Sequence, residues 1–201
     1  MRRLIVAMTG ASGSVLGIRL LESLKDCGIE SHLLISRWAQ RTIEHETTYS
    51  VDQVRGLATV AHSSADMGAT ISSGSFETEG MVVIPCSMRT LAAIANGYGD
   101  HLVHRAADVI LKERRRLVLV AREMPVSEVH LENMLKLARM GVVIMPPVPA
   151  FYNHPKSVAQ IVDHIVARVL AQLGIAAPFA KHWDGHMQKF AVAGRPDDDE
   201  D

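Results

Sequence analysis

Two short segments of this sequence carry residues that can bind a phosphate and move a proton. Residues 9–13 (T-G-A-S-G) lie between an apolar segment and a helical pattern. Small residues at such a junction let a phosphate approach backbone N–H groups and the positive end of a helix. Arg122 and Glu123 follow a second apolar segment, and a cation beside a carboxylate at a strand end can support acid–base chemistry. Together the two segments predict a phosphate-bearing ligand and a reaction.

Other polar residues have both a functional and an ordinary structural interpretation. Ser87 and Thr90 follow another apolar run, where they could hold a phosphate or cap a helix. Arg105, Asp108 and Lys112 fall on one face of a predicted helix. Taken alone, this spacing favours a solvated ion-pair face over a cationic wall for a phosphate leaving group.

Four further residues complete the set of candidates. Tyr152 could donate its hydroxyl to a phosphate or pack at a hinge before Pro155. Arg168 lies at the edge of an apolar helical stripe, where it could bind a phosphate or extend to solvent. Glu46 follows a helical stretch and, taken alone, is predicted to be solvent-exposed. Cys86 is predicted to be a buried thiol rather than a nucleophile, because no neighbouring base stands out.

The elements that must position these residues follow from the hydrophobic pattern. Continuous apolar runs predict buried strands over 3–8, 32–36, 80–86, 117–121 and 142–145. Helical stripes predict helices over 13–28, 37–45, 88–95, 101–112, 127–140 and 155–173. Residues 46–74 predict only a short helix, a short strand and a polar loop. This alternation predicts an α/β fold with a parallel sheet, helices on both faces, and ligands bound beyond the carboxyl ends of the strands.

Composition narrows the classes of protein that the chain could be. The 201 residues are 48% apolar with a net charge of −1, which gives no reason to expect nucleic acid or a membrane as partner. Two distant cysteines and no recognisable signal peptide predict a reduced cytoplasmic protein. None of the ten histidines shows a clear metal-ligand spacing, so no metal site is predicted. Residues 1–180 are expected to form one domain, and residues 181–201 an extension with an acidic, mobile tail.

Taken in order, these segments resemble the UbiX-like flavin prenyltransferase family, within the flavodoxin-like (Rossmann-like) three-layer flavoproteins. The resemblance spans about residues 3–175, and as an ordered set its motifs are highly specific. It is carried by residues 7–13, 36, 46–47, 73–75, 85–87, 105–109, 112–115, 117–123, 130–135, 151–152 and 166–168.

The resemblance implies a specific reaction. The protein would bind reduced FMN and dimethylallyl phosphate, join the prenyl group to the central-ring nitrogen of the flavin, and close a fourth ring onto the neighbouring carbon. Phosphate would leave, and no metal would be needed. The prenylated FMN would serve a UbiD-type decarboxylase. Family members typically form dodecamers in which subunits share sites.

The resemblance also implies roles for individual residues. Those expected to hold FMN are Gly10, Ala11, Ser12, Ser36, Ser87, Met88, Arg89, Thr90 and Arg122. Those expected to surround the prenyl phosphate are Glu46, Arg105, Lys112, Tyr152 and Arg168. Glu123 and Ser12 would handle protons, so the expected catalytic residues are Glu123, Ser12, Glu46, Lys112 and Arg105.

The sequence departs from the family pattern in one loop. Residues 65–70 (A-D-M-G-A-T) replace a Trp-Met pair that many members carry, and the segment before them is short. This version resembles the subgroup associated with phenolic (hydroxyarylic) acid decarboxylases. Two alternatives remain open: a flavin-dependent decarboxylase that acts on its substrate directly, and a non-catalytic flavin-carrying subunit.

Overall fold

The computed structural model describes residues 2–180 and 185 and is built on a six-stranded, fully parallel sheet of order β3-β2-β1-β4-β5-β6. The strands are β1 (Arg3–Met8), β2 (Glu30–Ile35), β3 (Val60–His62), β4 (Gly80–Cys86), β5 (Arg116–Ala121) and β6 (Val143–Ile144). The helices are α1 (Ser14–Asp26), α2 (Arg37–Glu46), α3 (Val51–Leu57), α4 (Met88–Ala95), α5 (Leu102–Lys112), α6 (Glu128–Arg139) and α7 (Val158–Gln172), with a short 3₁₀ helix, η1 (Thr70–Ser72).

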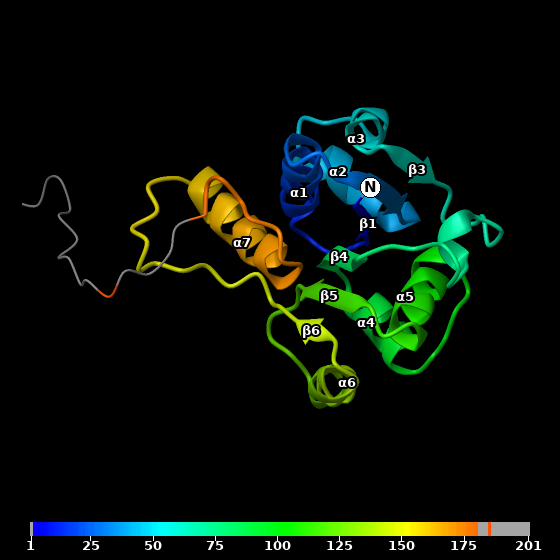
Figure 1. Ribbon diagram of the computed structural model, residues 1–201. Coiled ribbons are helices and arrows are strands. Elements are labelled where there is room, and N and C mark those ends of the chain that lie inside the picture. The colour runs from blue at the N-terminus through cyan, green and yellow to red at the C-terminus, as the bar shows by residue number, and fades with distance from the viewer. Residues whose placement is uncertain (1, 181–184, 186–201) are drawn as a thin grey trace, which may run out of the picture.

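The sheet separates two apolar cores, because alternate residues of each strand point to opposite faces. Leu4, Val6 and Met8 of β1 pack with α1, α2, α3 and α7, whereas Ile5 and Ala7 pack with α4, α5 and α6. Figure 1 shows these two groups of helices on either side of the strands. The expected three-layer α/β fold with helices on both faces is therefore confirmed.

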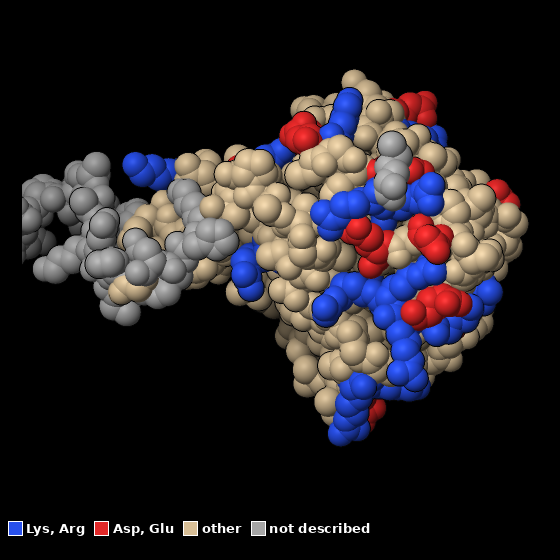
Figure 2. Space-filling view, in the orientation of Figure 1, with Lys and Arg blue, Asp and Glu red and all other residues tan. Residues whose placement is uncertain are grey.

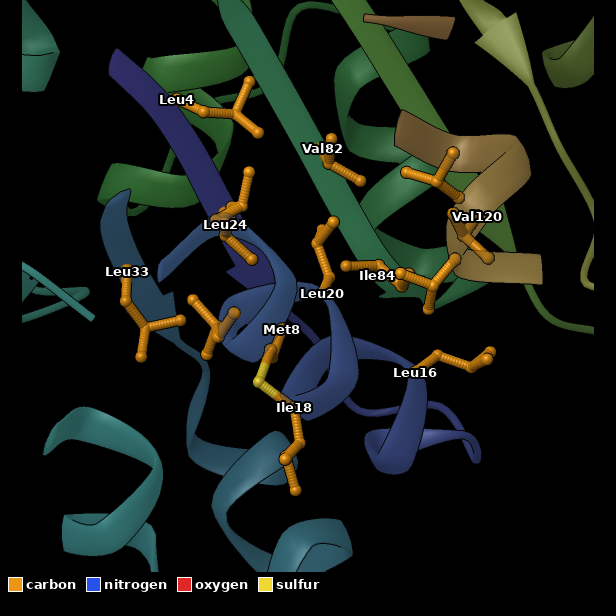
Figure 3. Packing of buried hydrophobic residues seen from close by; sticks show 14 of the residues in the cluster. Leu4, Met8, Leu16, Ile18, Leu20, Leu24, Leu33, Val82, Ile84 and Val120 are labelled. Carbon is orange, nitrogen blue, oxygen red and sulfur yellow. The ribbon is translucent and has the colours of Figure 1, made fainter. Parts of the chain in front are cut away.

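Helix α1 is the centre of the first core. Its predicted stripe of Leu16, Leu20, Leu21 and Leu24 is buried against the sheet, and Figure 3 shows Leu20 between Met8 and the β4 residues Val82 and Ile84. A fully buried leucine contributes about 1.5–3 kcal/mol relative to an exposed one. The packing fixes the start of α1 beside the end of β1, where the first candidate segment lies.

Helix α7 differs from the sequence-based expectation. It begins at Val158 rather than at Pro155, because the Ser157 side chain accepts the Gln160 N–H and caps the helix there. Val158, the first residue of α7, is 75% exposed, so the buried stripe of the helix begins later. The helix packs on α1 through later residues of the stripe, and Arg19 Nε lies 2.7 Å from Asp163 Oδ1.

The segment that leads into α7 forms a projection from the body of the protein, which we call the arm (residues 146–157). Figure 1 shows the arm and α7 extending away from the sheet on the side of α1. The predicted acidic tail lies outside the described residues. No helix in the described part of the chain is long and apolar enough to cross a membrane.

Candidate active site

Hydrogen bonds join the carboxyl ends of four neighbouring strands into one edge. Ser36 N–H donates to Met8 O (3.0 Å), and Arg122 N–H donates to Cys86 O (3.1 Å). The Thr9 hydroxyl donates to Pro85 O (2.9 Å) and accepts Ser87 N–H (2.8 Å). The loops after β2, β1, β4 and β5 therefore lie side by side, as the sequence predicted. We call this region the carboxyl edge.

The turn after β1 is shaped by close contact with α2. A Cβ atom on Gly10 would lie 2.5 Å from Cβ of Trp38, so only glycine fits there. Gly13 has a φ of 111° and forms the N-cap of α1. Trp38 was not singled out from the sequence, although the residue is 68% exposed. Its place two residues after Ser36, at the end of a predicted strand, was the available signal.

Glu46 binds the N-terminus of α1, a contact that its sequence position did not predict. Its Oε2 accepts Gly13 N–H (2.9 Å) and Ser14 N–H (3.0 Å) while the residue remains exposed. Burial favours the neutral acid, but hydrogen bonds from Ser14, Gly13 and the Ser12 hydroxyl outweigh it and lower the pKa of the Glu46 carboxyl.

This contact bears on the expected phosphate site. The Gly13 and Ser14 N–H groups at the start of α1 already donate to a carboxylate of the protein itself. The Ser36 and Ser87 hydroxyls at the carboxyl edge are further groups that can donate to a phosphate.

The turn after β4 offers fewer exposed groups than expected. Ser87 caps α4 by accepting Thr90 N–H (3.3 Å), and its hydroxyl lies 3.1 Å from that of Thr90. Met88 and Thr90 are buried, and the Met88 side chain packs in the second core. Cys86 is fully buried, so the prediction of a buried thiol is confirmed, and burial raises the pKa of this thiol, which disfavours the nucleophilic thiolate.

Arg122 and Glu123 are both exposed where β5 ends. Glu123 Oε1 accepts Met124 N–H (3.3 Å), which leaves most of the carboxylate accessible. Within the part of the chain that the structure describes, the Arg122 guanidinium forms no ion pair. An accessible guanidinium beside an accessible carboxylate is suited to anion binding and proton transfer.

Tyr152 and Arg168 come together around His164, a residue that the sequence analysis missed. The Tyr152 and His164 rings meet edge to face at 5.9 Å, and Asn153 Nδ2 lies 2.8 Å from His164 Nδ1. Burial, and then the Arg168 charge, lower the pKa of His164. The spacing of four residues between His164 and Arg168 on one helix was the available signal.

A cavity of about 310 Å³ lies beside His164. It is lined by Ala150, Asn153, Pro155, Gln160, Asp163, His164 and Phe179.

Lys112 does not lie at the carboxyl edge of its own chain. It ends α5 beside the start of β5, where Arg116 is paired with Gly80. Strand β5 separates this end of the sheet from Arg122 by about 20 Å at 3.3 Å per residue. Lys112 contacts Glu113, and Arg105, farther up α5, donates to Ser72 O (3.2 Å) and Asp108 (2.8 Å). Within one chain, neither cation meets Glu123.

The face on which the strands begin, where the N-terminus lies, carries charges of both signs (Figure 2). Arg2 binds Glu79 at 2.6 Å and Arg3 binds Glu30 at 3.1 Å. Lys112 thus belongs to a face of paired charges, and the structure of one chain supports the ion-pair interpretation that the spacing alone favoured.

Comparison with known proteins places this edge in context. A flavoprotein family model matches residues 1–170. A probable UbiX-like flavin prenyltransferase from Streptomyces sp. (strain D7) is 62% identical over 192 residues, covering 95% of this chain and 96% of that protein. The chain belongs to the UbiX-like flavin prenyltransferase family.

Two solved structures of the family share the whole fold. The crystal structure of AnUbiX (PadA1) in complex with FMN and dimethylallyl pyrophosphate is 52% identical with a TM-score of 0.91, covering 92% of this chain and 98% of that one. A dodecameric FMN-dependent UbiX-like decarboxylase from Escherichia coli O157:H7 is 60% identical with a TM-score of 0.90, covering 91% and 100%. The resemblance inferred from the sequence motifs is therefore confirmed.

Proposed function

We propose that the protein transfers a dimethylallyl group from dimethylallyl phosphate to reduced FMN. The observation that carries this proposal is the match, along nearly the whole chain, to a relative named as a flavin prenyltransferase. The AnUbiX structure adds support, because it holds FMN together with a dimethylallyl compound.

The carboxyl edge has groups that fit FMN. The Ser12, Ser36 and Ser87 hydroxyls and the Arg122 guanidinium can bind the phosphate and ring oxygens, while Gly10 and Ala11 leave room for the ligand. The exposed Trp38 ring offers an apolar surface for a flat aromatic group. Met88 and Thr90, both buried, would contribute through their backbone, and Arg89 through its exposed side chain.

When bound, reduced FMN supplies the ring nitrogen and neighbouring ring carbon that accept the prenyl group. The C–O bond of dimethylallyl phosphate breaks, and we propose that Arg168 and the Tyr152 hydroxyl bind the phosphate as it gains charge. Glu123 would accept and return protons, assisted by Ser12. Glu46 would hold Ser12 and the start of α1 in place.

We propose that Lys112 and Arg105 act in the site of a neighbouring subunit. Lys112 lies about 20 Å from Arg122 along β5 in its own chain, Arg105 contacts Ser72 and Asp108 rather than Glu123, and the E. coli relative is dodecameric. A shared site would explain why these two cations of α5 belong to the family motif. It would also place additional positive charge around the leaving phosphate.

Anaerobic incubation with reduced FMN, followed by mass and absorbance analysis of the flavin, tests the proposal. We expect a flavin heavier by one prenyl unit with dimethylallyl phosphate, and turnover unaffected by EDTA because no metal is proposed to take part in the transfer. Product only with the pyrophosphate would reassign the donor. Unchanged FMN with both donors, despite measured binding, would overturn the proposed transfer.

We further propose that the product serves a UbiD-type decarboxylase. A protein-free filtrate of the reaction should activate a purified decarboxylase of this type that lacks its cofactor. Failure of the filtrate, when the prenylated flavin is present in it, would overturn this step while leaving the transferase intact.

A further inference from the structure

A cluster of two histidines and one aspartate lies at the start of α5. The ligand atoms of Asp100, His101 and His104 all lie within 4.8 Å of one another. The histidines show no clear metal-ligand spacing along the sequence, but the turn into the helix brings His101 beside His104. None of the three residues has a role in the transfer proposed above.

The two distances from Asp100 to the histidines are close to those between ligands of a single metal ion. Asp100 Oδ1 lies 2.9 Å from His104 Nδ1 and 3.7 Å from His101 Nε2. The ring centroids of the histidines are 3.8 Å apart with a tilt of 31°. Tetrahedral Zn²⁺ with bonds of about 2.0–2.1 Å separates its ligand atoms by about 3.3 Å, which is within a few tenths of an ångström of both distances.

His104 also has hydrogen-bonding capacity that the described residues do not use. It is 3% exposed, yet within residues 2–180 and 185 neither of its ring nitrogens has a hydrogen-bond partner. Asp100 Oδ1 lies 2.9 Å from Nδ1, at ion-pair distance and with an electrostatic attraction to the ring, but the contact does not meet the geometric criteria of a hydrogen bond. A buried imidazole nitrogen without a hydrogen-bond partner calls for an explanation, and a bound ion is one. Asp100 Oδ1 and His104 Nδ1 are close enough to contact the same ion.

We propose that Asp100, His101 and His104 form a binding site for Zn²⁺, with a water molecule as the remaining ligand. Neutral imidazoles and one carboxylate are a ligand set that suits this ion.

Zinc at this site would alter the surroundings of Arg89. The Arg89 guanidinium lies 3.7 Å from the second oxygen of Asp100, and its side chain is largely exposed. The ion would compete with Arg89 for the carboxylate and free the guanidinium, which belongs to the turn proposed to bind FMN. The zinc site is therefore adjacent to the carboxyl edge but separate from the transfer chemistry.

Co²⁺ and Zn²⁺ titrations of the full-length, metal-free protein test the site. We expect one equivalent of Co²⁺ per chain to give the intense visible bands of low-coordinate cobalt, which added Zn²⁺ should abolish. His101→Ala and Asp100→Asn should each weaken Zn²⁺ binding at least tenfold. His45→Ala, which removes an exposed histidine of α2 outside the cluster, should not change it.

A further variant, His104→Phe, tests whether weaker Zn²⁺ binding could result from disturbed folding. His104→Phe fills the buried space without a ligand atom, so its thermal unfolding should resemble that of the wild type in the absence of metal. The wild type alone should gain thermal stability on addition of Zn²⁺. Equal Zn²⁺ affinity in the wild type, His101→Ala and His104→Phe would overturn the proposal, as would equal weakening in His45→Ala.

Discussion

Glu123 is the side chain that we propose to exchange protons at the carboxyl edge. We expect Glu123→Gln to retain FMN affinity, because the amide preserves shape, but to lose turnover by about 10²-fold or more, because it cannot accept a proton. Flavin fluorescence gives the affinity and mass analysis gives the turnover. Glu128→Gln, an exposed carboxylate in the first turn of α6, is the matched control. Unchanged turnover in Glu123→Gln would remove this residue from the mechanism.

Arg168 offers a test of the prenyl-phosphate site that is separate from flavin binding. Loss of a charge-assisted hydrogen bond costs about 1.5–3 kcal/mol, so Arg168→Ala should raise the KM for dimethylallyl phosphate about tenfold to a hundredfold. FMN affinity should not change. Arg139→Ala, at the exposed end of α6, provides the control. An equal loss of both affinities would show that Arg168 maintains structure rather than binding the substrate.

Glu46 should make a pH-dependent contribution to stability. Glu46→Gln removes the charge at the N-terminus of α1 and should lower the free energy of unfolding by about 0.5–1 kcal/mol at neutral pH, a range reduced for exposure to solvent. The folded pKa is lowered. The contribution is therefore complete above the ordinary carboxyl pKa of about 4.3 and is lost as pH falls through the lowered value.

Urea denaturation across this pH range measures the effect. The difference between wild type and Glu46→Gln should shrink in acid, whereas Glu44→Gln, an exposed neighbour on α2, should have little effect at any pH. A Glu46→Gln difference that is constant with pH would show that charge plays no part in the contact.

At the scale of the elements, the contact between the turn after β1 and α2 determines the shape of the carboxyl edge. Gly10→Ala places a methyl group against Trp38 and should destabilise the protein by about 1–3 kcal/mol and weaken FMN binding. Gly56→Ala, in α3 with open space around the added atom, should instead stabilise by up to about 1 kcal/mol. Denaturation and flavin titration of both variants check this. Normal FMN binding by Gly10→Ala would separate the contact from the site.

The elements themselves were largely predictable from the sequence, for physical reasons. Strands such as β1 and β4 are buried on both faces, so their continuous apolar runs stand out. Short elements were harder to predict: β3 is mostly exposed, and η1 has a single buried residue, Ile71, so neither gives a strong period. The start of α7 was misplaced because a serine cap outweighs the signal from a nearby proline.

The residues of the candidate site could be placed from the sequence only where the neighbouring residues show which strand or helix they follow. The Arg122–Glu123 pair follows a recognisable strand, so its place at the carboxyl edge could be inferred. The contact of Glu46 with α1 joins residues 32 and 33 positions apart and has no local pattern. His101 and His104 are brought together by the turn that starts α5, which no spacing rule identified.

At the scale of the whole molecule, the position of Lys112 leads to a test of shared sites. Lys112→Ala and Glu123→Gln should each be nearly inactive as pure proteins. If each site takes Lys112 and Glu123 from different subunits, about a quarter of the sites in a random one-to-one mixed assembly would combine two intact halves and regain activity. Co-expression with two affinity tags, followed by the turnover assay, measures this.

As a control for this experiment, purified Lys112→Ala and purified Glu123→Gln are mixed under conditions in which their subunits do not exchange. Mixed assemblies that stay as inactive as the single variants would show that Lys112 does not complete a neighbour's site. Mixtures of Glu123→Gln with itself under both tags should remain inactive.

The arm has a consequence for the life of a newly made chain. Val148 and Phe151 of the arm, and Val158 at the start of α7, are each at least 70% exposed, and Figure 1 shows the arm standing clear of the sheet. Exposed apolar side chains of this kind become buried either by native association with another subunit or by aggregation. The yield of native enzyme in a cell should then depend on the relative rates of subunit association and aggregation. Association should predominate when synthesis is slow, and aggregation when synthesis is faster than assembly.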